Sequence, residues 1–203
     1  MRLFHSPTSP YVRKVLVALQ ETGLLGRVTL VPVAGTPVAP DATVTALNPL
    51  GKIPALELDS GEVIYDSRVI CRWIDAEAGA GLYGPAGAEW PILTLEATAD
   101  GILDAALLMV YEWRVRPEER RHSPWVEGQW GKIARALDAL ESRWMGQLNG
   151  PLNMGQIAVG AALGYLDFRH ADRPWRAAHP HLAAWEAEFS ARLSMQQTRP
   201  PAA

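Results

Sequence analysis

The segment Asn48-Pro-Leu-Gly-Lys-Ile-Pro54, followed shortly by Tyr65-Asp-Ser-Arg-Val-Ile70, decides how this chain of 203 residues is interpreted. A loop proline that opens an edge strand is often cis, so we expect a cis bond between Ile53 and Pro54. That geometry would turn the N–H and C=O of Ile53 outward, where they can pair antiparallel with an extended peptide ligand. Lys52 would add a cation for a carboxylate. The alternative is a proline that merely ends a loop.

Asp66 and Ser67 stand directly after a short apolar run and directly before a helical pattern. A serine hydroxyl and the free N–H groups at a helix start can hold a carboxylate, and a nearby aspartate can hold an ammonium. Together they would recognise the end of an amino acid, which carries both charges on one carbon. The alternative is an ordinary helix cap.

The turn Ser6-Pro-Thr-Ser-Pro-Tyr11 follows a short strand pattern and opens an amphipathic helix. Its hydroxyls would lie beside the positive end of the helix dipole, where a thiolate is stabilised. The turn has no cysteine, so the thiol would have to come from a ligand, and Ser9 is the candidate donor to its sulfur. Ser6 and Thr8 share the turn, which leaves the choice of hydroxyl open. The alternative is that Ser9 is a plain N-cap before Pro10.

Strand and helix patterns divide the chain in two. Residues 1–78 give the order β-α-β, an irregular loop, then β-β-α, which predicts a thioredoxin-like domain. Residues 79–90 are rich in glycine and predict a linker. Residues 91–203 keep helical periodicity only and predict an all-helical bundle domain, in which Asn153 and Gln156 form a capping box. The expected fold class is therefore α/β plus all-α.

Composition excludes several classes of function. Lys and Arg total 19 against 22 Asp and Glu, a formal charge of −3 that gives no support for a nucleic-acid partner. No window approaches the roughly 18 apolar residues of a membrane span, and the first apolar stretch is too short for a signal peptide. Cys71 is the only cysteine, and the five histidines lack metal-ligand spacing. We therefore expect a cytoplasmic protein with no membrane association and no metal.

In their order and spacing, these segments resemble the glutathione-binding half of the glutathione transferase superfamily, most closely its bacterial members with serine in the first turn. The resemblance covers essentially the whole chain, and its most specific part is Asn-Pro-x-Gly-x-x-Pro followed by Asp-Ser. It implies glutathione as co-substrate. Ser9 then matches the Ser, Tyr or Cys that contacts the glutathione sulfur. Ile53 and Pro54 match the backbone-pairing residue and the cis-proline that hold the cysteinyl part.

The same resemblance assigns the two ends of the tripeptide. Lys52 matches a position that often reaches the glycine carboxylate, and Asp66 and Ser67 match the acidic residue and serine that clasp the γ-glutamyl end. The capping pair of residues 153 and 156 departs from the family's usual Ser or Thr with Asp. Both residues are competent caps, so we expect the fold to survive the change.

The resemblance further implies an activity and an assembly. Glutathione would be activated as a thiolate that attacks a small electrophile, and the protein would be a homodimer. Tyr111, Trp113 and Arg114 fall where the family lines its second-substrate pocket, and would offer an apolar wall with a cation for an anionic electrophile. The alternative is that the arginines of this region form a solvated face paired with neighbouring glutamates.

Two other functions are compatible with such a chain. One is a non-catalytic glutathione transferase-like protein used for binding or regulation. The presence of Lys52, Asp66 and Ser67 argues against it, because a pure interaction module would not need them. A glutathione-dependent reductase or peroxidase is disfavoured because the first turn lacks cysteine.

Overall fold

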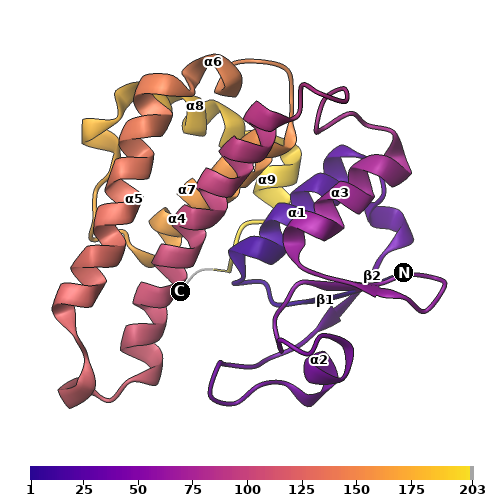
Figure 1. Cartoon of the computed structure of the whole chain (residues 1–203), viewed down its shortest axis with the longest axis horizontal. Coiled ribbons are helices and arrows are strands. Elements are labelled where there is room, and N and C mark those ends of the chain that lie inside the picture. The colour runs from indigo at the N-terminus through magenta and orange to yellow at the C-terminus, as the bar shows by residue number, and fades with distance from the viewer. Residues whose placement is uncertain (202–203) are drawn as a thin grey trace. The chain divides into compact units, whose positions relative to one another are not determined.

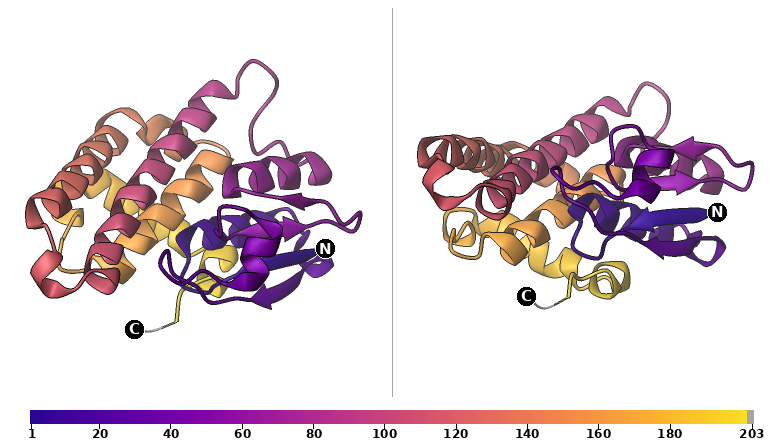
Figure 2. Two further views of the ribbon diagram at one scale, coloured as in Figure 1. Left: turned by 60° about the horizontal axis from the view of Figure 1, so that its bottom comes forward. Right: turned by 90° about the horizontal axis from the view of Figure 1, so that it is seen from below.

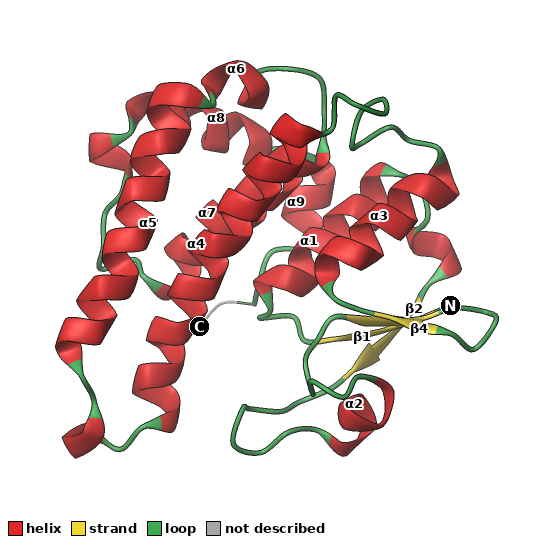
Figure 3. Ribbon diagram, in the orientation of Figure 1, coloured by secondary structure: helices red, strands yellow, loops and turns green. Residues whose placement is uncertain are grey.

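A four-stranded mixed sheet organises the N-terminal part of the chain (Figures 1 and 3). In the computed structural model, which describes residues 1–201, its strands take the order β2-β1-β3-β4. β1 pairs parallel with β2 and antiparallel with β3, and β3 pairs antiparallel with β4. The strand bounds are Arg2–His5 for β1, Thr29–Pro32 for β2, Ala55–Glu57 for β3 and Val63–Ile64 for β4.

Helices cover both faces of this sheet. α1 and α3 lie on one face and the short α2 on the other (Figure 1). α1 buries Val12, Val15 and Leu19, and α3 packs against it with Ile70 and Ile74, all of them at most 1% exposed. Burying each such side chain contributes about 1.5–3 kcal/mol. The helix bounds are Pro10–Glu21 for α1, Ala42–Leu47 for α2 and Ser67–Ala78 for α3, with a 3-10 turn at Leu25–Arg27.

The second part of the chain contains no strand among its described residues. Its helices are α4 (Trp90–Val115), α5 (Ser123–Arg143), α6 (Met145–Leu148), α7 (Met154–Arg169) and α8 (Pro180–Ser190), with 3-10 turns at Glu118–Arg120 and Arg176–Ala178. α7 is the central helix, buried without interruption from residue 154 to residue 163. The predicted combination of a thioredoxin-like half and an all-helical half is thus confirmed.

The start of α7 is fixed by the predicted capping box. The Asn153 side chain accepts from the Gln156 N–H at 3.1 Å, and the Gln156 side-chain oxygen accepts from the Asn153 N–H at 3.1 Å. The Gln156 amide nitrogen also donates to the carbonyls of Gln147, Leu148 and Gly150, at 2.8–3.1 Å. The Gln156 side chain therefore stabilises both the first turn of α7 and the turn that precedes it.

Contacts divide the chain into two compact units. The first holds Met1–Tyr83 together with the segment that begins at Leu193, and the second holds Gly84–Arg192. The first boundary falls within the predicted linker, residues 79–90. The last helix, α9 (Leu193–Gln197), packs against α1 of the first unit, whereas the sequence groups it with residues 91–203. Residues 202 and 203 of that predicted domain lie outside the described part.

No helix within residues 1–201 combines the length and the apolar character that a membrane crossing requires.

Candidate functional site

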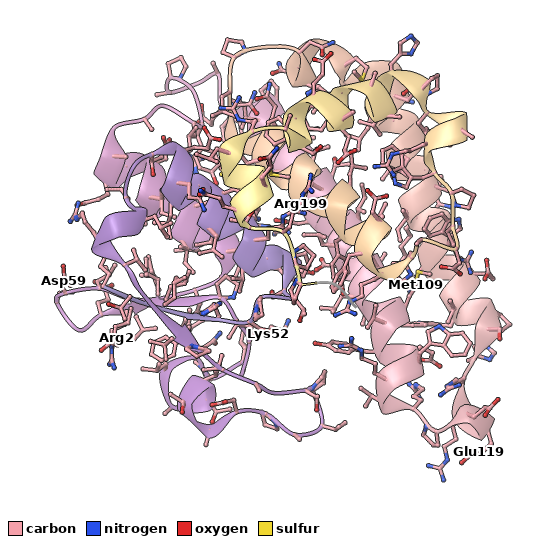
Figure 4. The ribbon with its side chains drawn as sticks, turned by 180° about the vertical axis from the view of Figure 1, so that it is seen from behind. Arg2, Lys52, Asp59, Met109, Glu119 and Arg199 are labelled. Atoms are coloured by element: carbon pink, nitrogen blue, oxygen red, sulfur yellow. The ribbon has the colours of Figure 1, made fainter. Side chains whose placement is uncertain are left out.

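Strand register brings the predicted segments to one end of the sheet. Phe4 pairs with Ala55, so the turn after β1 continues beside the residues that precede β3. Leu56 pairs with Ile64, so the residues that follow β4 arrive at the same end. Figure 4 shows Lys52 at the end of the sheet opposite the hairpin turn that carries Asp59. The first turn, the residues before β3 and the start of α3 are therefore neighbours.

Ser9 caps α1. Its backbone is extended, and its Oγ accepts from the Val12 N–H at 3.3 Å. Pro10 follows at the first helical position, where its missing N–H costs nothing because that group has no intrahelical partner. Since the Ser9 oxygen is the acceptor in this bond, its own proton stays available to a further acceptor.

Ser6 and Thr8 lie in the same turn, which closes with a bond from the Ser9 N–H to the Ser6 carbonyl at 3.1 Å. Their hydroxyl oxygens are 3.3 Å apart, and either one can donate to the other. One of the two protons is therefore used within the turn. The Ser9 hydroxyl is therefore the best-placed donor to a ligand in this turn. The second candidate is whichever hydroxyl of Ser6 and Thr8 accepts in their mutual bond, because its own proton is unused there.

The loop before β3 is held by a buried asparagine. Asn48, 1% exposed, donates from its side chain to the Lys52 carbonyl at 2.8 Å and accepts from the Leu50 N–H at 3.0 Å. Gly51 donates to the Asn48 carbonyl and has a φ of +62°, which glycine adopts without the steric cost that other residues meet. The side chain of Asn48 thus sets the path of the chain into Ile53.

The peptide bond between Ile53 and Pro54 is cis, as predicted. Pro54 is buried, and Ile53 is half-buried. Among the described residues, the N–H and C=O of Ile53 have no hydrogen-bonding partner. Lys52 is exposed, and within the same range its ammonium makes no ion pair.

Asp66 and Ser67 open α3. Asp66 is exposed, and its Oδ1 accepts from the Arg68 N–H at 2.9 Å as the helix cap. The peptide bond between Tyr65 and Asp66 is also cis. Ser67 is 3% exposed, yet no described residue accepts a hydrogen bond from its hydroxyl. Ser67 therefore keeps an unused donor at the start of a helix.

His5, the last residue of β1, leads into the first turn. Burial lowers the pKa of its imidazole, so the ring is neutral near pH 7. Its Nδ1 is buried, and residues 1–201 provide no hydrogen-bonding partner for it. Sequence reasoning did not single out this residue. No group of His, Cys, Asp and Glu side chains in the described part is arranged to hold a metal ion.

The structure separates the three residues predicted for the second substrate. Trp113 is 52% exposed, and the Arg121 guanidinium lies over its ring, 4.8 Å from the centroid. Tyr111 and Arg114 are one helical turn apart on α4 and interact electrostatically with each other. Burial raises the pKa of the Tyr111 phenol. The pair of Tyr111 and Arg114 thus shares a face of α4 that Trp113 does not.

Comparison with models of known protein families shows to which family this chain is related. Residues 8–77 match the family model of the glutathione S-transferase N-terminal domain, and residues 123–188 match that of the C-terminal domain. This chain belongs to the glutathione S-transferase superfamily. The two matches fall in different structural units, and they leave out residues 1–7 with β1, residues 78–122 with the whole of α4, and residues 189–203.

Individual relatives of this superfamily resemble the chain over its full length. A glutathione transferase family member from Pseudomonas fluorescens Pf-5, solved with bound glutathione, is 52% identical, with a TM-score of 0.96 and 98% of each chain covered. A structure from the same bacterium with bound S-(propanoic acid)-glutathione is 50% identical, with a TM-score of 0.92 and coverage of 98% and 99%. The uncharacterized GST-like protein YibF of Escherichia coli K12 is 35% identical, with both chains covered completely.

Proposed function

We propose that this member of the superfamily is a glutathione transferase, which binds glutathione at one end of the sheet and activates its thiol for attack on a small electrophile. The observation that carries the proposal is the meeting of three segments at that end: the first turn, the loop before β3 and the start of α3. Two helices, α1 and α3, begin there, so their N-terminal N–H groups add a positive potential.

Each part of the tripeptide has a partner in this arrangement. The γ-glutamyl end would be held by the Ser67 hydroxyl and the Asp66 carboxylate. The cysteinyl part would pair with the backbone of Ile53, whose N–H and C=O are unused among the described residues. The exposed Lys52 ammonium would take the glycine carboxylate. These assignments need only donors and acceptors that the described fold leaves available.

The thiolate would accept a hydrogen bond from Ser9. Because the Ser9 oxygen already accepts from the Val12 N–H, the serine proton can point toward the sulfur. A hydrogen bond to the charged form of a group favours that form, so the pKa of the bound thiol falls. The protein would thus position and ionise the nucleophile without forming a covalent intermediate itself.

Similar proteins support the choice of ligand. The relative from Pseudomonas fluorescens was solved with glutathione, and the related structure holds a glutathione whose sulfur carries a propanoic acid group. A site in this chain that accepts a substituted sulfur would be consistent with conjugation of glutathione to a second substrate.

Two measurements test the proposal against its rivals. Retention on immobilised glutathione, together with conjugation of 1-chloro-2,4-dinitrobenzene, is the expected result. Retention without turnover of any electrophile would favour the non-catalytic binding protein. A reductase or peroxidase would use a reactive cysteine, whereas Cys71 is buried within α3. Absence of retention would overturn every glutathione-dependent function.

A homodimer and a cytoplasmic location are also part of this proposal, on the strength of family membership alone. Light scattering on purified protein gives the mass directly, and a value of one chain would reject the dimer.

A further inference from the structure

The C-terminal segment that begins at Leu193 lies along α1 within the first unit (Figure 2). Near the start of α9, the Ser194 hydroxyl donates to the carboxylate of Glu21, the last residue of α1. One helical turn later, the Thr198 hydroxyl oxygen accepts a long hydrogen bond, 3.5 Å, from the Nε of Arg13. α9 and α1 are therefore antiparallel, and the segment passes from the end of α1 toward its start.

Arg13 makes the shorter of the two contacts near the start of α1. Its Nη2 donates to the Met195 carbonyl at 3.0 Å. This carbonyl is one of the last four of α9, which have no partner within their own helix, and a cation at that end also interacts favourably with the helix dipole. Arg13 is 8% exposed and Met195 is 1% exposed. The buried Arg13 guanidinium thus caps the end of α9 from a neighbouring helix.

The backbone of the same residue closes the first turn of α1. The Arg13 N–H donates to the Ser9 carbonyl at 3.0 Å, which is the first hydrogen bond of the helix. The Ser9 Oγ accepts from the Val12 N–H, the residue before Arg13, at 3.3 Å. Arg13 therefore has its side chain on α9 and its backbone on Ser9, so a displacement of one contact is passed to the other.

The position of this anchor matters for the proposed chemistry. Helix ends fray, and a hydroxyl that donates to a reacting atom has to stay within about 0.5 Å and 10–20° of the productive geometry. A contact that served only the stability of the fold could lie anywhere along α1, as the bond between Ser194 and Glu21 does at the far end. The contact of Arg13 lies one helical turn from Ser9.

We infer that Arg13 is a positioning residue for the proposed reaction. By binding the end of α9, it holds the first turn of α1 in the geometry in which the Ser9 hydroxyl donates to the glutathione thiolate. The segment from Leu193 to Thr198 then contributes to activation of the thiol through Arg13, without itself donating to the sulfur. This inference rests on the proposed transferase function and adds a residue to which the family resemblance assigns no role.

The test perturbs α9 at Gln196, whose side chain is exposed. Gln196→Pro disfavours the helical conformation of the preceding residue, Met195, and so displaces the carbonyl that Arg13 binds. The pKa of the glutathione thiol in the complex should rise by about half a unit or more, so kcat/KM near pH 7 should fall about 3-fold or more. The profiles should converge at a pH above both pKa values, because only thiol ionisation has changed. Gln196→Ala, which keeps the helix, should match the wild-type protein.

A double variant shows whether Arg13 acts through α9. Arg13→Met should raise the thiol pKa in the same way, and Arg13→Lys should raise it less, because lysine keeps the charge but loses the fork of donors. In the protein with both Arg13→Met and Gln196→Pro, the thiol pKa should shift no further than in the more affected single variant, because both substitutions break one contact. Additive shifts would overturn the inference, since Arg13 would then act through another partner.

Ser194→Ala is the matched control at the far end of α1. It should lower Tm by about 2–4 °C and leave the thiol pKa unchanged. A Gln196→Pro profile identical to that of the wild-type protein would overturn the inference and leave the proposed function intact. A shift in Ser194→Ala as large as that in Gln196→Pro would also overturn it, because general loosening of α1 would explain both.

Thermal melting identifies any variant that fails to fold. Thr198→Val, which removes the acceptor of the Arg13 Nε, then takes the place of Gln196→Pro, and Arg13→Lys takes the place of Arg13→Met. The same outcomes decide for or against the inference in these variants. Failure of the wild-type protein to bind glutathione would overturn the proposed function together with the inference.

Discussion

Replacement of Ser9 by alanine should have two separable effects, because Ser9 serves both the fold and the proposed chemistry. As the cap of α1, its Oγ accepts from the Val12 N–H at 3.3 Å, toward the long end of the normal range. Loss of an N-cap costs about 0.5–2 kcal/mol, and the long distance points to the lower half of that range. For a chain of this size, about 1 kcal/mol lowers Tm by about 2–4 °C.

The second effect of Ser9→Ala concerns the bound thiol. A hydrogen bond to a charged group contributes about 1.5–3 kcal/mol, and sulfur is a weak acceptor, so we take the low end. At about 1.4 kcal/mol for each unit, the pKa of the bound glutathione thiol should rise by about one unit. Turnover near neutral pH should then fall about 10-fold, and the difference should disappear at a pH above both pKa values.

The assay is the absorbance of thiolate near 240 nm, measured against pH for the complex with glutathione, together with the pH dependence of kcat/KM. Asn153→Ala is the control for stability, because it removes a helix cap from the other unit and should leave the thiol pKa unchanged. A Ser9→Ala profile identical to wild type would refute this role for Ser9. A shift seen instead in Ser6→Ala or Thr8→Ala would move the role to that hydroxyl.

Three further predictions concern the same two units. Ser67→Ala should weaken glutathione binding about 10-fold or more by calorimetry, since in the proposed complex the hydroxyl would donate to the γ-glutamyl carboxylate, whereas Ser60→Ala in the exposed hairpin turn should leave binding unchanged. Gln156→Glu should lower the free energy of unfolding by about 1–3 kcal/mol in urea melts, because it turns a donor to three carbonyls into an acceptor; equal stability would contradict those bonds. Burial lowers the pKa of His170, so the folded state binds fewer protons than the unfolded chain, and stability falls as pH drops below about 6.5. His170→Gln, which can still donate to the Ala106 carbonyl, should make that fall smaller between about pH 7.5 and 5.5, and an unchanged slope would contradict the assignment.

Elements whose signals are local could be predicted well from sequence in both units. The strand at Arg2–His5, the helix from Pro10 and the capping box of α7 each depend on residues within one or two turns of each other. Short elements are harder to predict from sequence. α2 lies in the segment that the sequence predicts to be an irregular loop, yet Asp41 caps six helical residues there by accepting from the Thr43 and Val44 N–H groups.

Long-range packing could not be predicted in the same way. The sequence places residues 193–197 in the helical domain and does not reveal that they form a helix that packs on α1, where the Arg13 guanidinium donates to the Met195 carbonyl at 3.0 Å.

The central claim is that one end of the sheet binds the γ-glutamyl tripeptide as a unit. Calorimetric titration of folded protein with glutathione and with cysteinylglycine, which lacks the γ-glutamyl group, tests it most directly. The account predicts saturable heat with glutathione and much weaker binding of the dipeptide, because Asp66 and Ser67 would then have no ligand group to hold. No heat with millimolar glutathione, or equal affinity for both ligands, would contradict it.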